Sequence, residues 1–468
     1  MKISYLCTIL LSASISKSSA WSISSSNQRR TSLTKVFSSN DSNVVLRPSD
    51  DPTAFDSFRI GTPRVHRYIR DSLSSIEDDS GEYVMWYHGR PSNFDESGEL
   101  PPLSTGRIGR ATSRNGLHWQ RSLEGSESED IGGVSLGLNK ESWWGFDTAH
   151  VGLGQVMLPM STPAVISEGG VYLMYYMGGS FEETPLSLYL DKDVELPQDA
   201  TIKGMNMHIG VALSQDGKSW GRIEGDFPCG AVMVPYSATN KDLNAPNRDD
   251  DDSLLTLDEE LYCAWPDVVM NSLTDAEKRK VGSKGSKPNF FMYYSTMTKD
   301  DRQKNIACAV SEDGFRWFKR GVCLRPSSEN EEDGFDNGGC ARCNVVRNAS
   351  YDKDSKVWRN ELGWTMYYEG ISNTDNKHRI MVATSLDGRT WEKQGLILDV
   401  GSSDSDWDCG GVGSPHVIRM DDGTTRMYYT GQGEDGSTAI GVAKCISNDN
   451  AASAEGWARE QAQFTFAE

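Results

Sequence analysis

Polar, charged and aromatic residues recur at fixed places in two short motifs that otherwise have the composition of β-strands. The first motif is Pro-x-Val in four copies and Cys-x-Val in a fifth. Its variable residues are Arg64, Ala164, Asp267, Asn344 and His416. One strand pleat earlier stand Thr62, Thr162, Trp265, Arg342 and Ser414. A packed core would need apolar residues at these places, so the set is typical of a ligand pocket.

The second motif is an aromatic pair followed by a variable residue, and its variable residues are His88, Met177, Ser295, Glu369 and Thr430. If the first motif begins one strand and the second ends its antiparallel neighbour, both sets meet at one end of the sheet. We therefore expect them to line the mouth of a funnel. Arg64, Arg342 and His416 favour an anionic ligand there, such as a phosphate or a carboxylated sugar.

These motifs belong to a unit that occurs five times. Each copy continues with an alternating apolar run, usually a Ser-x-Asp-Gly or Ser-x-Asn-Gly turn, and a Trp; the copies span 107–121, 207–222, 305–320, 379–393 and 439–459. Asp-Gly and Asn-Gly are strong hairpin signals, and Pro is tolerated at the first residues of a strand. Each unit thus supplies three strands, with a fourth after the Trp. Five four-stranded antiparallel sheets arranged radially make an all-β, five-bladed β-propeller. The alternative is a β-sandwich.

The chain also contains segments that could hold such blades together. Segment 44–48 resembles 322–326, an outer strand, so it is expected to complete the fifth blade, with 463–466 as a competitor. We expect the Trp residues of the turns to pack between blades: Trp119, Trp220, Trp317 and Trp391. Aromatic–Asp pairs end at Asp56, Asp147, Asp336 and Asp408, and their repetition favours turn bonds that tie adjacent blades. Loops 91–106 and 180–206 are long enough to form a rim or a lid.

After its leader, the whole chain resembles the five-bladed propeller glycosidase group. The group includes arabinanases and xylosidases of glycoside hydrolase family 43, invertase and levansucrase relatives of family 32, and the mannoside phosphorylases of family 130. The resemblance rests on the Ser-x-Asp-Gly-x-x-Trp copies, which are also similar to the sialidase Asp-box. Segment 264–268 with 291–295 resembles the arabinanase segment whose aspartate tunes the general acid. The resemblance implies that role for Asp267 and a sugar-stacking role for Trp265.

Two departures weaken a simple transfer of that mechanism. Family 43 enzymes carry a base Asp where this chain has Ala164, and an acid Glu where it has Arg342 and Asn344. Hydrolysis by that route needs two carboxyls, about 6.5–9.5 Å apart for inversion or about 5–5.5 Å for retention. Only Asp267 remains on the first strands, so a replacement would come from Glu369, Asp147, Asp336 or Asp408.

We therefore expect a carbohydrate-active enzyme that acts on glycosidic bonds, with Asp267 and Glu369 as the catalytic carboxylates. The expected substrate-binding residues are Trp265, Arg64, Arg342, Asn344, His416, His88 and Asp147. One alternative is a sugar-binding or scaffold propeller without activity. Another is an inverting phosphorylase, which needs one protein carboxylic acid and phosphate as nucleophile. His416 could instead be a core histidine, or hold a central ion or water as in some arabinanases.

The sequence gives no sign of a metal or cofactor. The acidic run 249–252 lacks the spaced ligands and the glycine turn of a calcium loop. Cys340 and Cys343 form a lone Cys-x-x-Cys pair, which is better explained as buried thiols than as zinc ligands. The expected partner is a carbohydrate or a sugar phosphate.

Charge and the first residues bear on location. The 468-residue chain has a formal net charge of −20, although its first 40 residues contain five basic residues and no acid. Such an acidic chain disfavours nucleic acid, and no apolar run after the leader is long enough to span a membrane. Residues 1–20 have the pattern of a signal peptide, 21–43 that of a transit segment, and 44–468 that of the propeller. Trp21 after the small-residue site resembles algal bipartite plastid presequences. We expect plastid import, with secretion as the alternative.

Overall fold

We describe the protein from a computed structural model. The structure describes residues 42–68, 82–91, 106–122, 132–157, 171–190, 199–237, 239, 257–271, 274, 276–277, 289–328, 334–445 and 456–462. The predicted leader at 1–43 therefore lies almost wholly outside the described residues, as do segments 158–170 and 463–468. Within the described part, no helix is long and apolar enough to cross a membrane.

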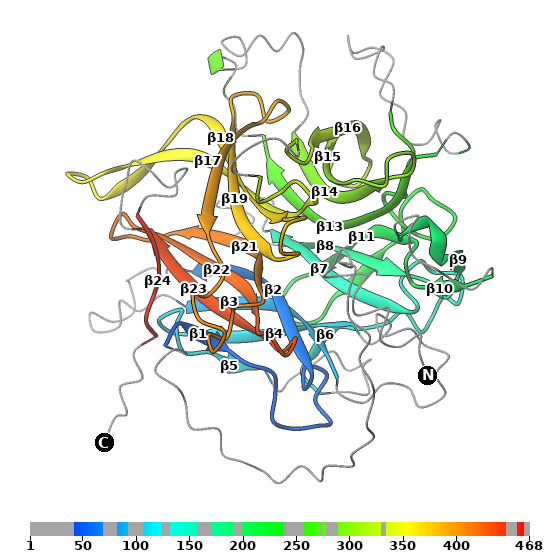
Figure 1. The fold of residues 1–468 in the computed structure, drawn as a ribbon, viewed down its shortest axis with the longest axis horizontal. Coiled ribbons are helices and arrows are strands. Elements are labelled where there is room, and N and C mark those ends of the chain that lie inside the picture. The colour runs from blue at the N-terminus through cyan, green and yellow to red at the C-terminus, as the bar shows by residue number, and fades with distance from the viewer. Residues whose placement is uncertain are drawn as a thin grey trace.

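The chain forms five antiparallel blades arranged around a common axis, as predicted (Figure 1). Blade one is β2 (Arg59–Tyr68), β3 (Glu82–Arg90), β4 (Arg107–Ser113) and β5 (Gln120–Arg121), with β6 (Val134–Leu136) also on β4. Blade two is β7 (His150–Met157), β8 (Tyr172–Gly179), β11 (Met207–Ser214) and β12 (Gly221–Ile223). Between β8 and β11 lies a separate hairpin of β9 (Glu183–Pro185) and β10 (Thr201–Lys203).

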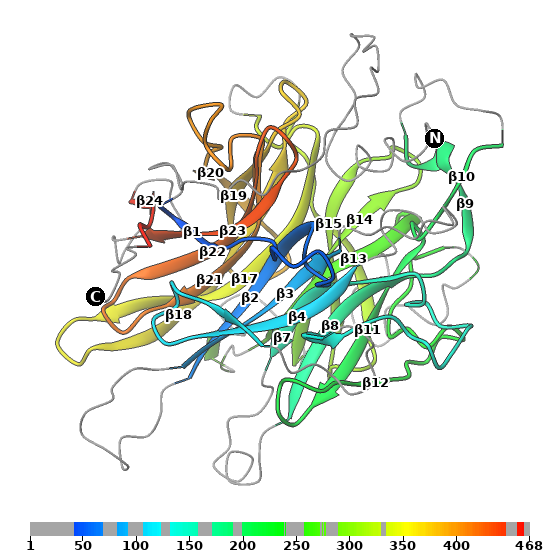
Figure 2. The same ribbon diagram turned by 90° about the horizontal axis from the view of Figure 1, so that it is seen from below.

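The remaining three blades repeat this order. Blade three is β13 (Glu260–Met270), β14 (Phe290–Thr298), β15 (Lys304–Ser311) and β16 (Phe318–Leu324). Blade four is β17 (Gly339–Asp352), β18 (Val357–Ile371), β19 (His378–Ser385) and β20 (Glu392–Leu398). Blade five is β21 (Gly411–Arg419), β22 (Thr425–Gln432) and β23 (Thr438–Cys445), completed by β1 (Val44–Leu46) and β24 (Trp457–Arg459). The long β17–β18 hairpin projects beyond the other blades (Figures 1 and 2).

Both ends of the described chain contribute to the outer edge of blade five. Val44 and Leu46 of β1 pair with Gly441 and Ile440 of β23, which confirms that this segment closes the ring. Trp457–Arg459 of β24 pairs with the rest of β23, at Ala443–Cys445. The competing segment 463–466 lies outside the described residues.

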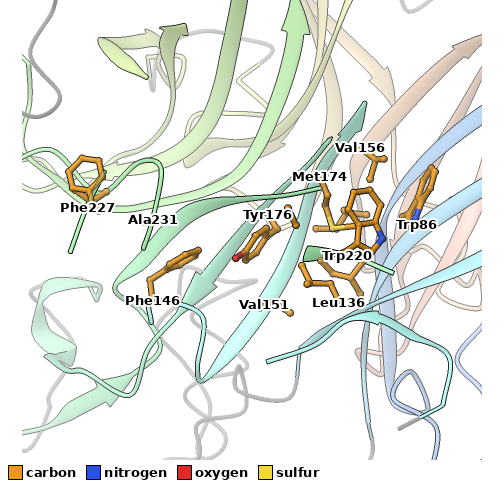
Figure 3. Packing of buried hydrophobic residues seen from close by; sticks show 14 of the residues in the cluster. Trp86, Leu136, Phe146, Val151, Val156, Met174, Tyr176, Trp220, Phe227 and Ala231 are labelled. Carbon is orange, nitrogen blue, oxygen red and sulfur yellow. The ribbon is translucent and has the colours of Figure 1, made fainter. Parts of the chain in front are cut away.

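Aromatic side chains fill the spaces between neighbouring blades. The ring of Trp220 in blade two lies 6.3 Å from that of Trp86 in blade one (Figure 3). Trp317 packs in the same way on Tyr175, Trp391 on Tyr293 and Trp119 on Tyr428. The prediction that these Trp residues pack between blades is therefore confirmed.

The Ser-x-Asp-Gly turns connect the blades by hydrogen bonds. In blade four, Asp387 accepts bonds from the backbone N–H groups of Arg389 and Thr390, which fixes the turn. The Gly388 carbonyl then accepts a bond from the Tyr293 hydroxyl of blade three at 2.6 Å. Equivalent bonds run from Tyr175 to Gly314, from Tyr428 to Gly116, and from Trp86 to Gly217. The turn is thus a clamp for the preceding blade.

The aromatic–Asp pairs have a structural role, as their repetition indicated. In blade two, Asp147 accepts bonds from the Tyr176 hydroxyl at 2.8 Å and from Arg222 at 2.6 Å. Arg222 also donates to the Gly137 carbonyl, which follows the outer strand of blade one. Similar ties join Asp56, Asp336 and Asp408 to a tyrosine and a cation. Each tie links strands within its own blade. Its cation also donates a hydrogen bond to the preceding blade.

Blade three contains a fifth tie that the motif search missed. Glu260 accepts bonds from the Tyr294 hydroxyl at 2.7 Å and from Lys319 at 2.5 Å. The acid here lies on the first strand itself, with no aromatic residue before it, so the sequence pattern differs while the geometry is kept.

One strand assignment was wrong. The segment around Thr162 and Ala164 was expected to begin the first strand of blade two, but that strand is β7, and 158–170 lies outside the described residues. The residue of β7 at the irregularity shared with the other first strands is Gln155. The error arose because β7 has Gly154 where the other motifs have Pro or Cys, whereas a Pro-x-Val sequence happens to follow it.

Candidate functional site

Eight residues of the two sequence motifs meet at one end of the blades. A cavity of about 380 Å³ is lined by residues of all five blades, and we call it the five-blade cavity. Its predicted members are Thr62, His88, Met177, Trp265, Arg342, Glu369, Ser414 and Thr430. The two motifs therefore do converge. An adjoining cavity of about 40 Å³ shares Trp265, Arg342, Glu369 and His378 with it.

A bulge in the first strands aims the motif residues at this cavity. Pairing shifts between Gly61 and Arg64 in β2, and at the same place in the other four first strands. In four of them the residue before Pro or Cys has a positive φ; these are Thr62 (49°), Trp265 (48°), Arg342 (27°) and Ser414 (50°). Left-handed backbone is unfavourable for such side chains, and strain of this kind collects at functional sites.

Among the described residues of the cavity, Glu369 is the one carboxylate that is buried and held by cations and backbone together. Arg342 Nη1 donates to its Oε1 at 3.2 Å, and His378 Nδ1 lies 2.6 Å from the same oxygen. The backbone N–H of Ser414 donates to Oε2 at 2.9 Å. Burial alone would raise the pKa of Glu369, but Arg342, His378 and these hydrogen bonds outweigh it and lower the pKa to about 2.

The carboxylate of Glu369 fits only because β21 passes very close. A Cβ at Gly413 would lie 2.1 Å from Glu369 Oε2. The glycine therefore allows the backbone of blade five to approach and donate to the carboxylate. Because Glu369 is ionised at neutral pH, it can orient a base or balance a positive charge, but it cannot serve as a general acid.

His378 was not predicted, yet it contacts Glu369 and lines the cavity. Its Nδ1 is bound to Glu369, its side chain is 13% exposed, and it lines both cavities. Its Nε2 is buried and has no hydrogen-bond partner among the described residues. A carboxylate that fixes one imidazole nitrogen leaves the other for a ligand or a proton. The missed signal was the register, because His378 begins β19 two residues before Ile380, the partner of Glu369.

Arg342 and Trp265 form one wall of the cavity. The Arg342 guanidinium carbon lies 4.4 Å from the centre of the Trp265 ring, and Trp265 is only 9% exposed. One ring face is therefore already covered by a cation, so Trp265 offers less open surface than a sugar-stacking platform would need.

Further basic residues line the cavity. Burial and then the charges of Arg59 and Arg342 lower the pKa of Arg90 to about 10. Burial, followed by Arg90, His150 and Arg342, lowers the pKa of His88 well below its usual value, so this imidazole is neutral. Lys377 also lines the cavity. Crowded cations favour an anionic ligand.

A second layer, beneath the cavity, holds Arg64 and Asp267. Arg64 is 1% exposed and donates to the carbonyls of Pro63, Gly154, Cys343 and Pro415. Its Nη2 also lies 3.8 Å from Asp267 Oδ1. Arg64 thus contacts all five blades at the axis. It does not line the five-blade cavity, in contrast to the expectation of a substrate contact.

Asp267 is fully buried in this axial layer. Its Oδ1 accepts bonds from Gln155 Nε2 at 3.0 Å and Asn344 Nδ2 at 3.1 Å, and its Oδ2 accepts one from the Val345 N–H at 2.8 Å. Burial raises the pKa of Asp267 to about 6, although Arg64 and the hydrogen bonds act against it. A raised pKa suits a general acid, but its location does not, because Asp267 does not line the cavity.

The other expected binding residues also lie outside the cavity. His416 Nε2 lies 2.9 Å from the Val65 carbonyl and the residue is 6% exposed, which agrees with the core-histidine alternative. Asn344 accepts a bond from the Val417 N–H. Asp147 belongs to the tie in blade two. Cys340 and Cys343 are buried thiols, as expected, and the described residues form no cluster of His, Cys, Asp or Glu suited to a metal.

Comparisons with known proteins identify the fold. No family model matches the chain, and no curated protein matches its sequence. A solved structure of an RGII complex of BT0996 has a TM-score of 0.50 and 15% identity, covering 87% of this chain and 91% of its own. A glycosyl hydrolase from Bacteroides ovatus has a TM-score of 0.45 and 14% identity, covering 86% and 91%.

A third similar structure comes from work titled as the GH130 family of mannoside phosphorylases, which contains glycoside hydrolases that target beta-1,2 mannosidic linkages in Candida mannan. It has a TM-score of 0.45 and 13% identity, covering 89% of this chain and 96% of its own. The likeness to the first of these structures, at 15% identity, shows the fold alone, because one fold carries many functions.

Proposed function

We propose that this chain is a carbohydrate-active enzyme that cleaves a glycosidic bond in the five-blade cavity, with inorganic phosphate as the nucleophile. The observation that carries the proposal is the Glu369–His378 pair in a cavity rich in cations. The motif resemblance to propeller glycosidases and phosphorylases supports the substrate class. Solved structures of the same fold bear glycosidase and phosphorylase names.

Electrostatics favours phosphate over a second protein carboxylate. Among the described residues, the carboxylates that line the cavity are Glu369, Asp375 and Glu434. Glu369 is ionised, and Arg379 lowers the pKa of Asp375 by a hydrogen bond of 2.6 Å. Neither is suited to donate a proton. Arg59, Arg90, Arg342 and Lys377 instead offer a site for the phosphate.

In the proposed reaction each group has one task. A phosphate oxygen attacks the anomeric carbon while the bond from that carbon to the glycosidic oxygen breaks. The leaving oxygen takes a proton from Nε2 of His378, which takes the place of the expected carboxylic acid and whose ring Glu369 orients through Nδ1. The products are a sugar 1-phosphate and a shortened saccharide. Glu369 is then a positioning residue, and Asp267 supports the axial layer.

Turnover of a panel of arabino-, xylo-, fructo- and mannosides, with and without phosphate, tests this proposal. We expect release only with phosphate, and a loss of about 100-fold or more in kcat for His378→Asn, the size typical of a lost general acid. Asp267→Asn should retain activity wherever it folds. Release that needs no phosphate and is abolished by Asp267→Asn would instead establish hydrolysis through Asp267.

A sugar-binding propeller without turnover is the second candidate. It is favoured by the burial of Asp267 and by the saturated hydrogen bonding of Glu369. In that case sugars would raise the melting temperature, and no member of the panel would be cleaved under either condition.

We also propose that the first 43 residues direct the chain into a plastid. Fusion of 1–43 to a fluorescent protein in an alga with secondary plastids tests this, with a Trp21→Ala fusion as the matched control. Plastid fluorescence that Trp21→Ala abolishes is expected, whereas secretion of both fusions would support the alternative.

A further inference from the structure

A second cavity lies at the far end of the blades from the five-blade cavity. It has a volume of about 470 Å³ and lies between blades four and five, with Arg67 from blade one. Along β17 its residues follow Asn344, along β21 they follow His416, and along β18 they precede Glu369. Because these strands run from one end of the propeller to the other, the two cavities open at opposite ends. We call this second one the far cavity.

The far cavity has an excess of positive charge. Its charged lining residues, within the described part of the chain, are three arginines and one glutamate: Arg67, Arg347, Arg419 and Glu361. Arg67 pairs with Asp421, and Arg347 donates to Glu277 at 2.7 Å. Arg419 has no carboxylate partner among the described residues. Its guanidinium donates a hydrogen bond to the Arg347 carbonyl. A half-buried guanidinium without a counter-charge is costly, and an anion would offset that cost.

The wall of the far cavity is rigid and aromatic. The guanidinium carbon of Arg419 lies 5.3 Å from the centre of the Trp358 ring. The indole N–H donates to the Met420 carbonyl at 2.8 Å, and the Tyr351 ring packs against Trp358 at 5.3 Å. Arg347 is 8% exposed and held by the Glu361 carbonyl at 2.7 Å. These groups are fixed before any ligand arrives, which lowers the entropy cost of binding.

We propose that the far cavity is a second binding site, for a small organic anion whose carboxylate or phosphate meets Arg419 and whose remaining part lies beside Val346 and Ile418. Val346 and Ile418 add apolar surface beside the polar Asn348, Thr365 and Thr425, so a free inorganic ion would leave the apolar part of the cavity unfilled. The site shares no described lining residue with the five-blade cavity. It therefore does not depend on the proposed reaction.

Calorimetric titration of the full chain with glucose 6-phosphate, glucuronate and neutral glucose tests this site. We expect Arg419→Gln to weaken one anion-binding event by about tenfold or more, because it removes a charge-assisted contact. Glu361→Gln, which removes the only carboxylate among the described lining residues, should tighten the same event by about two- to threefold. The two anions distinguish a phosphate site from a carboxylate site, and glucose should show neither effect.

Arg342→Gln is the matched control, since it alters the five-blade cavity and should leave this binding event unchanged. If Arg419→Gln does not fold, Glu361→Gln still decides the matter, because the Glu361 side chain is exposed. Anion binding that neither far-cavity variant changes would overturn the proposal, as would the absence of anion binding outside the five-blade cavity.

Discussion

Glu369 and Asp267 are both buried carboxylates, yet their surroundings shift their pKa values in opposite directions. Glu369 has a guanidinium, an imidazole and a backbone N–H in direct contact, which hold its pKa at about 2. Asp267 is bonded by two neutral amides and one backbone N–H, with Arg64 3.8 Å away, and burial keeps its pKa at about 6. Partner charge and distance, and not residue type, therefore separate the two.

Glu369→Gln is expected to destabilise the protein by about 3 kcal/mol at neutral pH, because Arg342 then loses its buried partner. The pKa of Glu369 is lowered in the folded state, so its stabilising effect is present above the usual pKa of 4.5 and is lost as the pH falls towards 2. Urea unfolding from pH 3 to pH 7 measures this. The gap between wild type and variant should shrink at low pH, and a gap that widens there would contradict the assignment.

Arg64→Met is expected to destabilise the propeller by about 3–5 kcal/mol, since it leaves Asp267 without a counter-charge and four carbonyls without a donor. Arg67→Met in the same strand is the matched control. Its partner Asp421 is 63% exposed, so we expect about 0–1 kcal/mol. Equal effects of the two variants in urea unfolding would show that the axial arginine is not a structural centre.

At the scale of elements, the blades are held together by contacts that the sequence motifs encode. The Trp after each turn packs on the preceding blade. A tyrosine hydroxyl of the preceding blade donates a hydrogen bond to the turn carbonyl, as Tyr293 does to Gly388. The Trp repeats at a fixed spacing, so its packing between blades could be predicted, whereas the bond to the turn carbonyl was not. The bulge of the first strands could not be predicted, because Gly154 and Cys343 take the place that Pro occupies in the other three blades. The misplaced strand at Ala164 followed from that.

Tyr293→Phe is expected to cost about 1 kcal/mol, because it leaves the buried Gly388 carbonyl without its donor. Tyr351→Phe removes a hydroxyl that bonds the Asp421 carbonyl at an exposed position, so its effect should be smaller. Thermal unfolding of both variants provides the comparison. A larger loss for Tyr351→Phe would argue against the clamp between blades three and four.

At the scale of the whole molecule, the ring is closed by a strand from the other end of the chain. The resemblance of segment 44–48 to an outer strand was enough to predict β1. Which residues face the cavity was harder to predict, because side chains two positions apart in one strand lie in different layers. Thr62 and Arg342 line the cavity, whereas Arg64 and Asn344 do not. His378 required the register between β18 and β19.

Leu46→Asp should therefore open the ring and destabilise the protein by more than about 3 kcal/mol, since a charge would replace a buried leucine. Val357→Asp at an exposed site on β18 is the matched control. Urea unfolding of both variants, and their proteolysis under native conditions, report the effect. A Leu46→Asp protein as stable as Val357→Asp would contradict closure by β1.

The function of the five-blade cavity is tested most directly by ³¹P NMR of the protein with inorganic phosphate and the panel of saccharides. The proposed reaction predicts that the phosphate signal declines while a sugar 1-phosphate signal grows, and that His378→Asn abolishes the change. Saccharide cleavage with no incorporation of phosphate would contradict it, and so would phosphorolysis that proceeds unchanged in His378→Asn.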